Sequence, residues 1–439
     1  MKINKKFLAF FIIFGLILRF TISASNYYGD IDLFFLPWAN DIIKFGFSGF
    51  YERNILTANY PPLTLICFAI ELYLYKTVFL PINSLLWFLN LNIPLFPSQL
   101  VHIWQNRNTV ATFIKGASIF ADIFLAIGLF KIASLMTKNK KIILIIFLSA
   151  LFNPAIIYNS SLWGQIDTIP LAFLVWSIYL IYTKKYLISS FLLFLGLLSK
   201  QTIGIILPIY AFMFWKYFSK KNKIGAFVLG LFIFFIVFIP FSSKGDNLLF
   251  PYLTYLNLAT KFGSSWLSAH AFNIWYLVFS PANISDTFLL FGRLTPRILS
   301  SMLVIINTAF VLFIFWKRKL KLEQTIFSIT LVTMFMFLFS TRMHERHLLP
   351  TLPFLLLLSA INVRYYWLFL YAAFFHLLNL YASWGQPRNN FIFDLTTNRI
   401  FVNLIIVIQI LIYFVIFYYF VVFSTKNNLS KSKTRLIKD

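Results

Sequence analysis

Apolar runs alternate with short polar segments along most of the chain. Runs of about 20 apolar residues are long enough to cross a bilayer as α-helices. Clusters of Lys and Arg beside these runs orient them, because cytoplasmic loops carry an excess of basic residues. The pattern predicts about twelve spans with both chain ends in the cytoplasm, at 7–23, 109–135, 142–158, 168–182, 186–198, 203–218, 224–240, 297–316, 322–339, 348–362, 365–382 and 400–424. We therefore expect an all-α, polytopic membrane protein.

Three segments remain outside the expected spans. Residues 24–108 and 241–296 form two long external loops, and residues 425–439 form a basic cytoplasmic tail. The first loop is expected to contain amphipathic helices, one of them near Leu33. Its apolar portion, 61–80, is expected to lie in or dip into the outer leaflet, although it is long enough to cross. No linker separates parts of the chain, so residues 1–439 are expected to form one membrane domain.

Composition supports this assignment. The chain is 60% hydrophobic and 12% charged, whereas soluble domains carry about a quarter charged residues. The net charge of +25 comes from 38 basic and 13 acidic residues. The basic residues lie beside the spans, so the positive-inside rule explains them and no nucleic-acid partner is expected. A basic N-terminus and a first span without a small-residue cleavage site predict a retained signal anchor in the plasma or inner membrane.

Acids and histidines gather on one side of this topology. The positive-inside rule does not sort acids, so the asymmetry predicts a polar site on the external face. The acids expected outside, or at the outer ends of spans, are Asp30, Asp32, Asp41, Glu52, Glu71, Asp167, Asp246, Asp286, Glu345 and Asp394. The corresponding histidines are His102, His270, His344 and His347.

The first candidate motif is Gly29-Asp30-Ile31-Asp32, just outside the first span. Two carboxylates at this spacing can act as a general base or as metal ligands. The alternative interpretation is a solvated loop in which the carboxylates cap a helix. Asn59-Tyr60-Pro61-Pro62 follows in the same loop, and its tandem prolines favour a structural role at a helix start.

Two further motifs lie in the middle of the chain. The run Trp163-Gly164-Gln165-Ile166-Asp167 offers an aromatic face, an amide and a carboxylate, which together suit a hydroxylated ligand. It can equally be an aromatic belt followed by a helix cap. In Ser199-Lys200-Gln201, a lysine at an external boundary runs against the positive-inside bias. It needs a partner such as a phosphate or an acid, unless its ammonium group extends to the interface.

The segment 341–347, Thr-Arg-Met-His-Glu-Arg-His, carries five ionisable groups at the expected outer end of a span. Guanidinium and imidazole groups in this number can hold a lipid-linked phosphate, and Glu345 can orient one of them. A metal site is less favoured because Glu345 is the sole acid among several cations. Contact with phospholipid headgroups is the alternative.

Taken together, these motifs resemble the GT-C superfamily of glycosyltransferases that use polyprenyl-phosphate sugars. The likeness is to the dolichyl-phosphate-glucose glucosyltransferases and to bacterial mannosyltransferase-like relatives. It rests on Gly29-Asp30, Tyr60-Pro61-Pro62-Leu63-Thr64, Asn153-Pro154, Trp163-Gly164-Gln165-Ile166-Asp167, Lys200-Gln201 and His344-Glu345-Arg346, in that order. Arg346 stands where the eukaryotic enzymes have lysine, and Trp163-Gly164-Gln165 replaces their His-Phe-Gln.

The resemblance implies a GT-C fold and the transfer of a hexose from a polyprenyl phosphate to a glycan, lipid or protein acceptor on the external face, with inversion. Asp30 would be the general base, with Asp32 as second choice. The donor phosphate would be bound by His344, Arg346, Lys200 and Arg342. The sugar or acceptor would be bound by Trp163, Gln165, Asp167, Gln201 and Glu345. No cofactor or metal is expected, because a lipid monophosphate offers no diphosphate to chelate.

Two other functions are compatible with the sequence. A transporter or flippase of lipid-linked sugars would show internal repeats and ionisable groups at mid-membrane. The sequence shows no repeat, and its candidate groups lie at external boundaries, which favours the enzyme. A ligase or polymerase that moves a whole glycan from a lipid diphosphate is the nearer alternative. The single cationic cluster argues against it.

Overall fold

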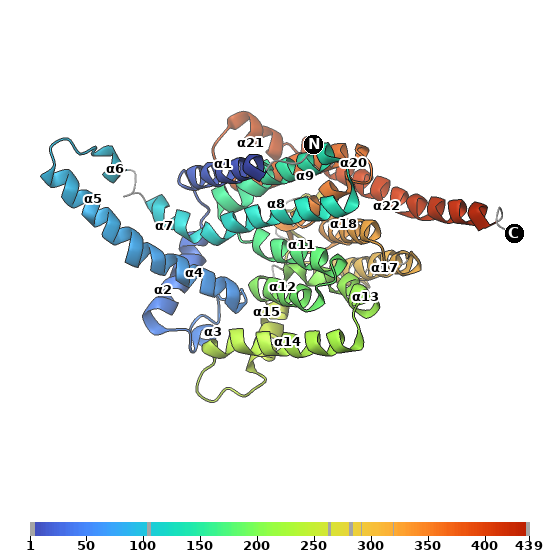
Figure 1. Cartoon of the computed structure of the whole chain (residues 1–439), viewed down its shortest axis with the longest axis horizontal. Helices are drawn as coiled ribbons and strands as arrows, with labels where there is room; N and C mark the ends of the chain where they lie inside the picture. The colour runs from blue at the N-terminus through green and yellow to red at the C-terminus, as the bar shows by residue number, and fades with distance from the viewer. Residues whose placement is uncertain are drawn as a thin grey trace. The chain divides into compact units, whose positions relative to one another are not determined.

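The computed structural model describes residues 5–102, 107–261, 265–280, 284–290, 292–318 and 320–435. Parts of the two expected external loops (103–106, 262–264, 281–283 and 291) and the end of the expected tail (436–439) lie outside the described residues. The described chain is mostly helical (Figure 1). A short parallel pair, β1 (Ser268–Ala269) with β2 (Met343–His344), is the one sheet within the described ranges. The expected all-α class is confirmed.

Contacts divide the chain into two compact units. Unit 1 comprises Met1–Gly128, Leu151–Ile203 and Ile224–Phe262, and unit 2 comprises Leu129–Ala150, Gly204–Lys223 and Gly263–Asp439. The helices of unit 1 are α1 (Lys5–Ser23), α2 (Leu36–Phe45), α3 (Phe50–Arg53), α4 (Pro62–Leu74), α5 (Leu80–Asn92), α6 (Gln99–His102), α7 (Arg107–Ile114), α10 (Pro154–Ile157), α11 (Thr168–Tyr182), α12 (Tyr186–Ser199) and α15 (Phe250–Lys261). Those of unit 2 are α13 (Leu207–Tyr217), α16 (Ile274–Phe279), α17 (Pro296–Lys317), α18 (Leu322–Phe339), α19 (Thr351–Leu358), α20 (Arg364–Trp384), α21 (Asn390–Thr397) and α22 (Arg399–Arg435). Residues of α8 (Gly116–Met136), α9 (Lys140–Leu151) and α14 (Lys220–Phe238) belong to both units.

Eight helical stretches in the described part of the chain are long and apolar enough to cross a membrane. They are Lys5–Ser23, Pro62–Asn92, Gly116–Met136, Lys140–Trp163, Lys220–Phe241, Pro296–Lys317, Leu322–Phe339 and Arg399–Val422. The protein is therefore a membrane protein of several spans, and the expected number of twelve is not reached on this criterion. Helices α11 and α12 are apolar but have 15 and 14 residues, and α19 has only 8.

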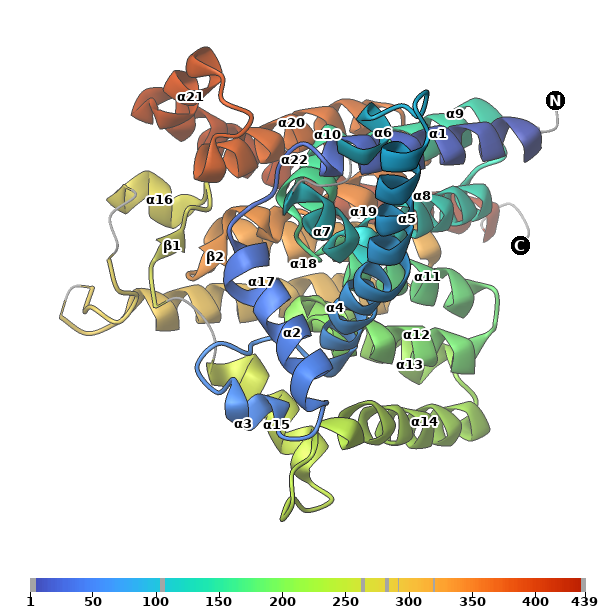
Figure 2. The ribbon, with the colours of Figure 1, turned by 90° about the vertical axis from the view of Figure 1, so that its left-hand side faces the viewer.

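The largest departure from expectation lies in residues 62–92. Here α4, a π-helical turn (Tyr75–Phe79) and α5 join end to end as one helix of 31 residues (Figure 2). At 1.5 Å per residue this helix is about 46 Å long, more than a bilayer core needs. The expected in-plane segment 61–80 therefore ends in the middle of a helix that qualifies as a candidate span. Pro62 occupies the first turn of α4, as the tandem prolines predict.

The core of unit 1 fixes the segment that follows Asp30. Ile31, Phe35, Trp38 and Ile42 are buried and recur at helical spacing, so they form the inner face of an amphipathic helix. Phe35 stacks on Phe68 of α4, with ring centroids 4.6 Å apart. Leu33, which was expected on this face, points outward with 67% of its surface exposed.

Unit 2 has its own core, centred on α18, most of whose side chains are buried. Helices α17, α19 and α22 each pack against α18. The Tyr413 hydroxyl of α22 donates a hydrogen bond to the Asn307 side chain of α17 at 2.5 Å. The segment 341–347 follows α18 directly, and the pairing of β2 with β1 holds its start.

Candidate functional site

The Asp30 carboxylate lies just before a π-helical turn, Ile31–Phe35, and does not cap it. Instead Oδ2 accepts a hydrogen bond from Nε2 of Gln165 at 2.5 Å. Asp30 is half-buried and Gln165 is fully buried. The capping alternative is therefore wrong for Asp30. Helical residues two apart do not face each other, so Asp32 and Asp30 do not converge on one point. Within the described ranges, no three His, Cys, Asp or Glu side chains are grouped so as to hold a metal ion.

A turn at Gly164 positions Gln165 beside Asp30. The π-helical turn Tyr158–Trp163 ends at Gly164, whose φ is +96°. The N–H groups of Gly164 and Gln165 both donate to the Asn159 carbonyl, at 3.1 and 2.8 Å. A Cβ at Gly164 would lie 2.6 Å from Cδ1 of Ile31. Glycine is thus required here by its backbone conformation and by the close approach of the segment after Asp30.

Trp163 is buried and faces the loop after α1. Its carbonyl accepts a hydrogen bond from the Tyr28 N–H at 3.0 Å, and its ring centroid lies 4.8 Å from that of Tyr28. It does not form an exposed aromatic belt, because only 1% of its surface is accessible. The burial of Trp163 therefore argues against a place in an aromatic belt at the membrane interface.

Lys200 has an acid as its partner. Nζ donates to Oδ1 of Asp167 at 2.6 Å, and both side chains are buried. The ammonium also lies 5.3 Å from the centre of the Tyr60 ring. The alternative in which Lys200 extends to the interface is wrong. A buried ion pair of this kind is weak evidence for stability, since desolvation offsets the attraction, so its value lies in fixing Asp167.

Gln201 connects two of the sequence motifs. Its Nε2 donates to the carbonyls of Asn59 and Leu258, at 3.3 and 3.2 Å. The Asn59-Tyr60 and Lys200-Gln201 motifs are thus brought together. Gln201 is half-buried and supports the backbone around them.

Lys115, between α7 and α8, escaped the sequence analysis. It is fully buried, and four carbonyl oxygens lie within hydrogen-bonding distance of its Nζ, which has three hydrogens to share among them: Asn26 at 2.6 Å, Ser23 at 2.9 Å, Ser161 at 3.0 Å and Leu162 at 3.1 Å. It therefore ties the loop before Asp30 to the turn before Gln165. The sequence does contain a signal that could have identified Lys115: it is a lysine inside the apolar run 109–135.

Two buried amides of unit 1 have polar atoms without a hydrogen-bond partner among the described residues. They are both side-chain polar atoms of Asn159 and Oε1 of Gln165. Neither residue is exposed to solvent. An unmade hydrogen bond of a buried polar group costs about 1–3 kcal/mol, and each such group requires an explanation. A hydroxylated ligand or bound water would satisfy them. Asn159 was not identified from the sequence.

Unit 1 also holds an ion pair inside candidate spans. Arg19 Nε donates to Oδ2 of Asp122 at 2.8 Å, and both side chains are fully buried. The Ser160 hydroxyl donates to the same oxygen at 2.6 Å, and the Arg19 guanidinium also reaches the Leu151 carbonyl at 2.7 Å. The expectation that ionisable groups lie only at external boundaries is therefore incomplete.

The segment 341–347 of unit 2 contains two arginines with different partners. Arg342 donates to both oxygens of the buried Asp286, at 2.6 and 3.0 Å. The hydrogen bond to Asp286 raises the pKa of Arg342 above its ordinary value. Arg342 has a φ of +64°, a left-handed conformation that is strained for a residue with a Cβ. The Arg342–Asp286 pair thus holds a strained turn.

Arg346 pairs within the segment. Its Nη1 donates to Oε1 of the buried Glu345 at 2.9 Å, and Nδ1 of His344 lies 4.0 Å from Oε2 of the same carboxylate. The His344 N–H donates to Nδ1 of His347 at 3.1 Å. With Asp286 included, two carboxylates face the two guanidiniums. The local positive excess expected from the sequence is therefore smaller, because each guanidinium is paired with a carboxylate.

The predicted residues fall into two sets. Unit 1 holds Asp30, Asp32, Trp163, Gln165, Asp167, Lys200 and Gln201, and unit 2 holds Arg342, His344, Glu345 and Arg346. In unit 1 the direct pairs are Asp30 with Gln165 and Asp167 with Lys200. We call the four residues of these pairs, together with Trp163 and Asn159, the Asp30 group. In unit 2, Glu345 joins His344 and Arg346.

No family model matches this chain, and no curated protein matches it.

Proposed function

We propose that the protein is a membrane glycosyltransferase of GT-C type. In this proposal it transfers a hexose from a polyprenyl-phosphate sugar to a glycan, lipid or protein acceptor on the external face of the cell membrane. The observation that carries the proposal is the Asp30 carboxylate, held by a buried glutamine instead of capping its helix. The ordered motifs that resemble the GT-C enzymes support it further.

The proposed reaction is a single displacement. The acceptor hydroxyl gives its proton to Asp30 as its oxygen bonds to the anomeric carbon. The bond from that carbon to the phosphate oxygen breaks, and the lipid phosphate leaves with the electron pair. Attack opposite the leaving group inverts the anomeric centre. A positioned base contributes about 10² to 10⁴ to the rate of such a step.

The neighbouring residues take supporting roles in this proposal. Trp163, Gln165, Asp167, Gln201 and Glu345 are assigned to the sugar or acceptor, and the unpartnered amide of Asn159 joins them. His344 and Arg346 are assigned to the departing phosphate. Lys200 is buried in its pair with Asp167, and Arg342 holds both oxygens of Asp286 through two hydrogen bonds. We therefore reassign these two from direct phosphate contacts to positioning Asp167 and the segment 341–347. Arg346 donates one hydrogen bond to Glu345, so it keeps its assignment to the phosphate.

The transport alternative gains one specific observation. Arg19 and Asp122 form a fully buried ion pair inside candidate spans, and intramembrane ionisable groups commonly mark transport pathways. Against transport, each known partner of this pair is structural: a backbone carbonyl or the Ser160 hydroxyl. The glycan ligase or polymerase remains the nearer alternative, which a donor panel separates.

The experiment uses the purified full chain in nanodiscs with a panel of radiolabelled polyprenyl-phosphate sugars and a mixed acceptor fraction. Wild type, Asp30→Asn and Asp41→Asn are compared. Asp41 lies in the same expected loop and pairs with Arg53 near the surface, which makes it a matched carboxylate control. We expect transfer or hydrolysis from at least one donor, lost in Asp30→Asn and kept in Asp41→Asn.

If none of the donors releases label, with wild type and Asp30→Asn alike, the enzyme assignment is overturned. Transfer only from a lipid diphosphate glycan would replace it by a ligase. Movement of an intact lipid-linked sugar between leaflets without cleavage would replace it by a flippase.

A further inference from the structure

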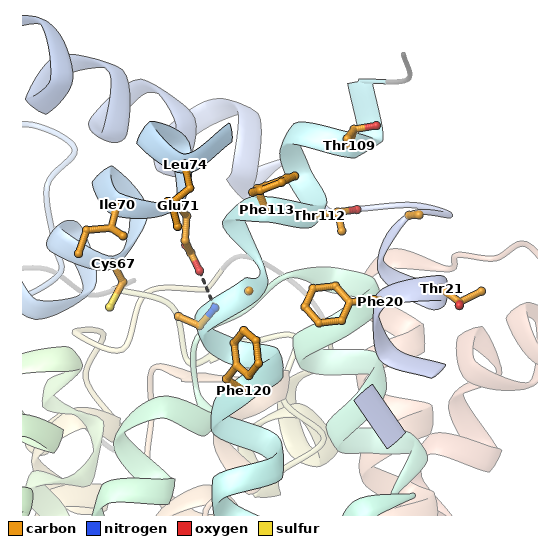
Figure 3. A pocket seen from close by; sticks show the side chains of 13 residues that line it. Phe20, Thr21, Cys67, Ile70, Glu71, Leu74, Thr109, Thr112, Phe113 and Phe120 are labelled. Carbon is orange, nitrogen blue, oxygen red and sulfur yellow. Dashed lines mark hydrogen bonds between the residues drawn. The ribbon is translucent and has the colours of Figure 1, made fainter. Parts of the chain in front are cut away.

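A cavity of about 800 Å³ lies within unit 1, lined by side chains from α1, α4, α7 and α8 (Figure 3). Helices α1, α4 and α8 all belong to candidate membrane spans. The walls are mainly apolar and include Phe20, Ile70, Phe113 and Phe120. The volume falls in the range of small-molecule sites, about 300–1,000 Å³. None of its lining residues belongs to the Asp30 group.

One carboxylate interrupts this apolar lining. Oε1 of Glu71 accepts a hydrogen bond from the Ala117 N–H at 2.5 Å, which is the dashed line in Figure 3. Oε2 is buried and has no hydrogen-bond partner among the described residues. Only 9% of the Glu71 surface is exposed. A Cβ at Gly116 would lie 3.1 Å from Oε1, so the glycine leaves room for the carboxylate to approach α8.

Two threonines of the cavity wall, Thr21 and Thr112, donate their hydroxyl hydrogens elsewhere and not to Glu71. The Thr21 hydroxyl donates to the Ile17 carbonyl at 2.9 Å, and the Thr112 hydroxyl donates to the Asn108 carbonyl at 2.8 Å. Both hydrogens are thus used within their own helices. A buried polar atom left in this way normally has a partner. Because α1, α4 and α8 belong to candidate membrane spans, a molecule dissolved in the membrane can supply that partner.

We propose that the cavity binds a membrane-dissolved long-chain alcohol. Its chain fills the apolar walls, and its hydroxyl bonds to Oε2 of Glu71. A single free oxygen suits a hydroxyl, which has one hydrogen to donate and can also accept if the carboxyl is protonated. An ammonium head has three N–H groups to satisfy and would find one acceptor. A phosphate head would set a second anion against the carboxylate, and a plain hydrocarbon would leave Oε2 unpaired.

The test is photoaffinity labelling of the full chain in phosphatidylcholine nanodiscs. The probe is hexadecanol carrying a diazirine and an alkyne, and adducts are mapped by mass spectrometry. We expect adducts on peptides that contain Ile70 and Phe120. Unlabelled hexadecanol should compete about tenfold better than hexadecane, the ratio that one hydrogen bond to a carboxyl group provides. Hexadecyl phosphate and hexadecylamine should compete no better than hexadecane.

Three variants separate the polar contact from the cavity itself. Glu71→Leu should abolish the preference for hexadecanol over hexadecane. Thr21→Val, which alters the same wall without touching Oε2, should keep it. Ile70→Trp adds bulk to the cavity wall and leaves Glu71 in place, so it should reduce probe adducts and weaken competition by hexadecanol and hexadecane alike. Monodisperse elution in gel filtration confirms that each variant is folded.

Cys67 provides a second readout without mutation. It lines the cavity and is the single cysteine of the sequence. Hexadecanol should protect Cys67 from a membrane-permeant maleimide at about tenfold lower concentration than hexadecane in wild type, and at the same concentration as hexadecane in Glu71→Leu. Equal competition by hexadecane or hexadecyl phosphate, a preference that survives in Glu71→Leu, or adducts confined to other helices would each overturn the proposal.

Discussion

The two units differ in how their candidate polar residues are distributed along the sequence. In unit 1 each partner lies far away in sequence: 135 residues separate Asp30 from Gln165, and 33 separate Lys200 from Asp167. In unit 2 most of the chemistry lies in one run of seven residues, and Arg346 pairs with its neighbour Glu345. The tertiary fold therefore builds the Asp30 group, whereas a local segment carries the cations of unit 2.

The Lys200–Asp167 pair of unit 1 is also more deeply buried than the cationic side chains of segment 341–347 in unit 2. The Lys200 and Asp167 side chains are 6% and 5% exposed, while Arg346 and His344 are 15% and 33% exposed. Charges removed from water are held in one geometry, which suits the positioning of a base and a hydroxyl. Charges with partial access to water can take up and release an anion at lower desolvation cost. This difference agrees with the proposed function, in which unit 1 positions the base and unit 2 contacts the phosphate.

The largest expected effect concerns which carboxylate of unit 1 carries proton transfer. Asp30→Asn should lower kcat about 10² to 10⁴-fold, because it removes a positioned base. Asp32→Asn should lower it much less, because Asp32 lies on another side of the same helical turn. Steady-state turnover of the donor found in the panel measures both. Equal losses in the two variants would break the assignment of Asp30 as base.

The second prediction concerns the buried ion pair. Lys200→Met leaves Asp167 charged and buried, so it should lower the free energy of unfolding by about 3–5 kcal/mol. The double variant Lys200→Met/Asp167→Leu should recover part of this loss. Chemical unfolding in mixed micelles measures the difference. The exposed Arg53–Asp41 pair of the same unit is the control, and Arg53→Met should lower that free energy by less than about 1 kcal/mol. Similar losses for both pairs would contradict the contrast drawn from burial.

A smaller loss of stability is expected for substitution of Lys115. This residue connects the loop before Asp30 with the turn before Gln165. Lys115→Met removes the donor for four carbonyls and should lower the free energy of unfolding by about 2 kcal/mol. Because it also loosens the Asn26 and Ser161 backbones, kcat should fall together with stability. Lys44→Met, at an exposed position on α2, is the matched control and should change neither. Full activity in Lys115→Met would show that the lysine does not position Asp30.

The contrast between the units also explains what the sequence could predict. Segment 341–347 shows its cations side by side, so its identification needed no fold. Asp30, Gln165, Asp167 and Lys200 were chosen as residue types, but their pairings depend on chain segments up to 135 residues apart. Asn159, Lys115 and the Arg19–Asp122 pair lie in apolar runs and resemble incidental polar residues until their partners are known. Asp286 was predicted as external, but not as the partner of Arg342.

Helix 62–92 shows a second limit of sequence reasoning. The expected segment ends at residue 80, and Pro81 follows it. A proline inside a helix lacks an N–H, and its ring clashes with the carbonyl four residues back. The structure instead places a π-helical turn at Tyr75–Phe79, directly before Pro81. Such a turn shifts the hydrogen-bond register, and the helix continues to Asn92. The hydropathy pattern contains the apolar run but not this local change of register.

The smallest expected effect distinguishes the two arginines of unit 2. Arg342→Lys cannot reproduce the forked contact with Asp286, and the loss of one of its two hydrogen bonds should lower stability by about 1 kcal/mol. It should leave the KM for the donor unchanged, because the guanidinium is engaged by Asp286. Arg346→Lys keeps the charge and should raise the KM for the donor a few-fold while stability stays the same. Thermal unfolding and donor titration of both variants measure the two quantities. If Arg342→Lys raised the KM for the donor as much as Arg346→Lys, Arg342 would return to the phosphate contacts, and the Asp286 pair would be a resting state that the donor displaces.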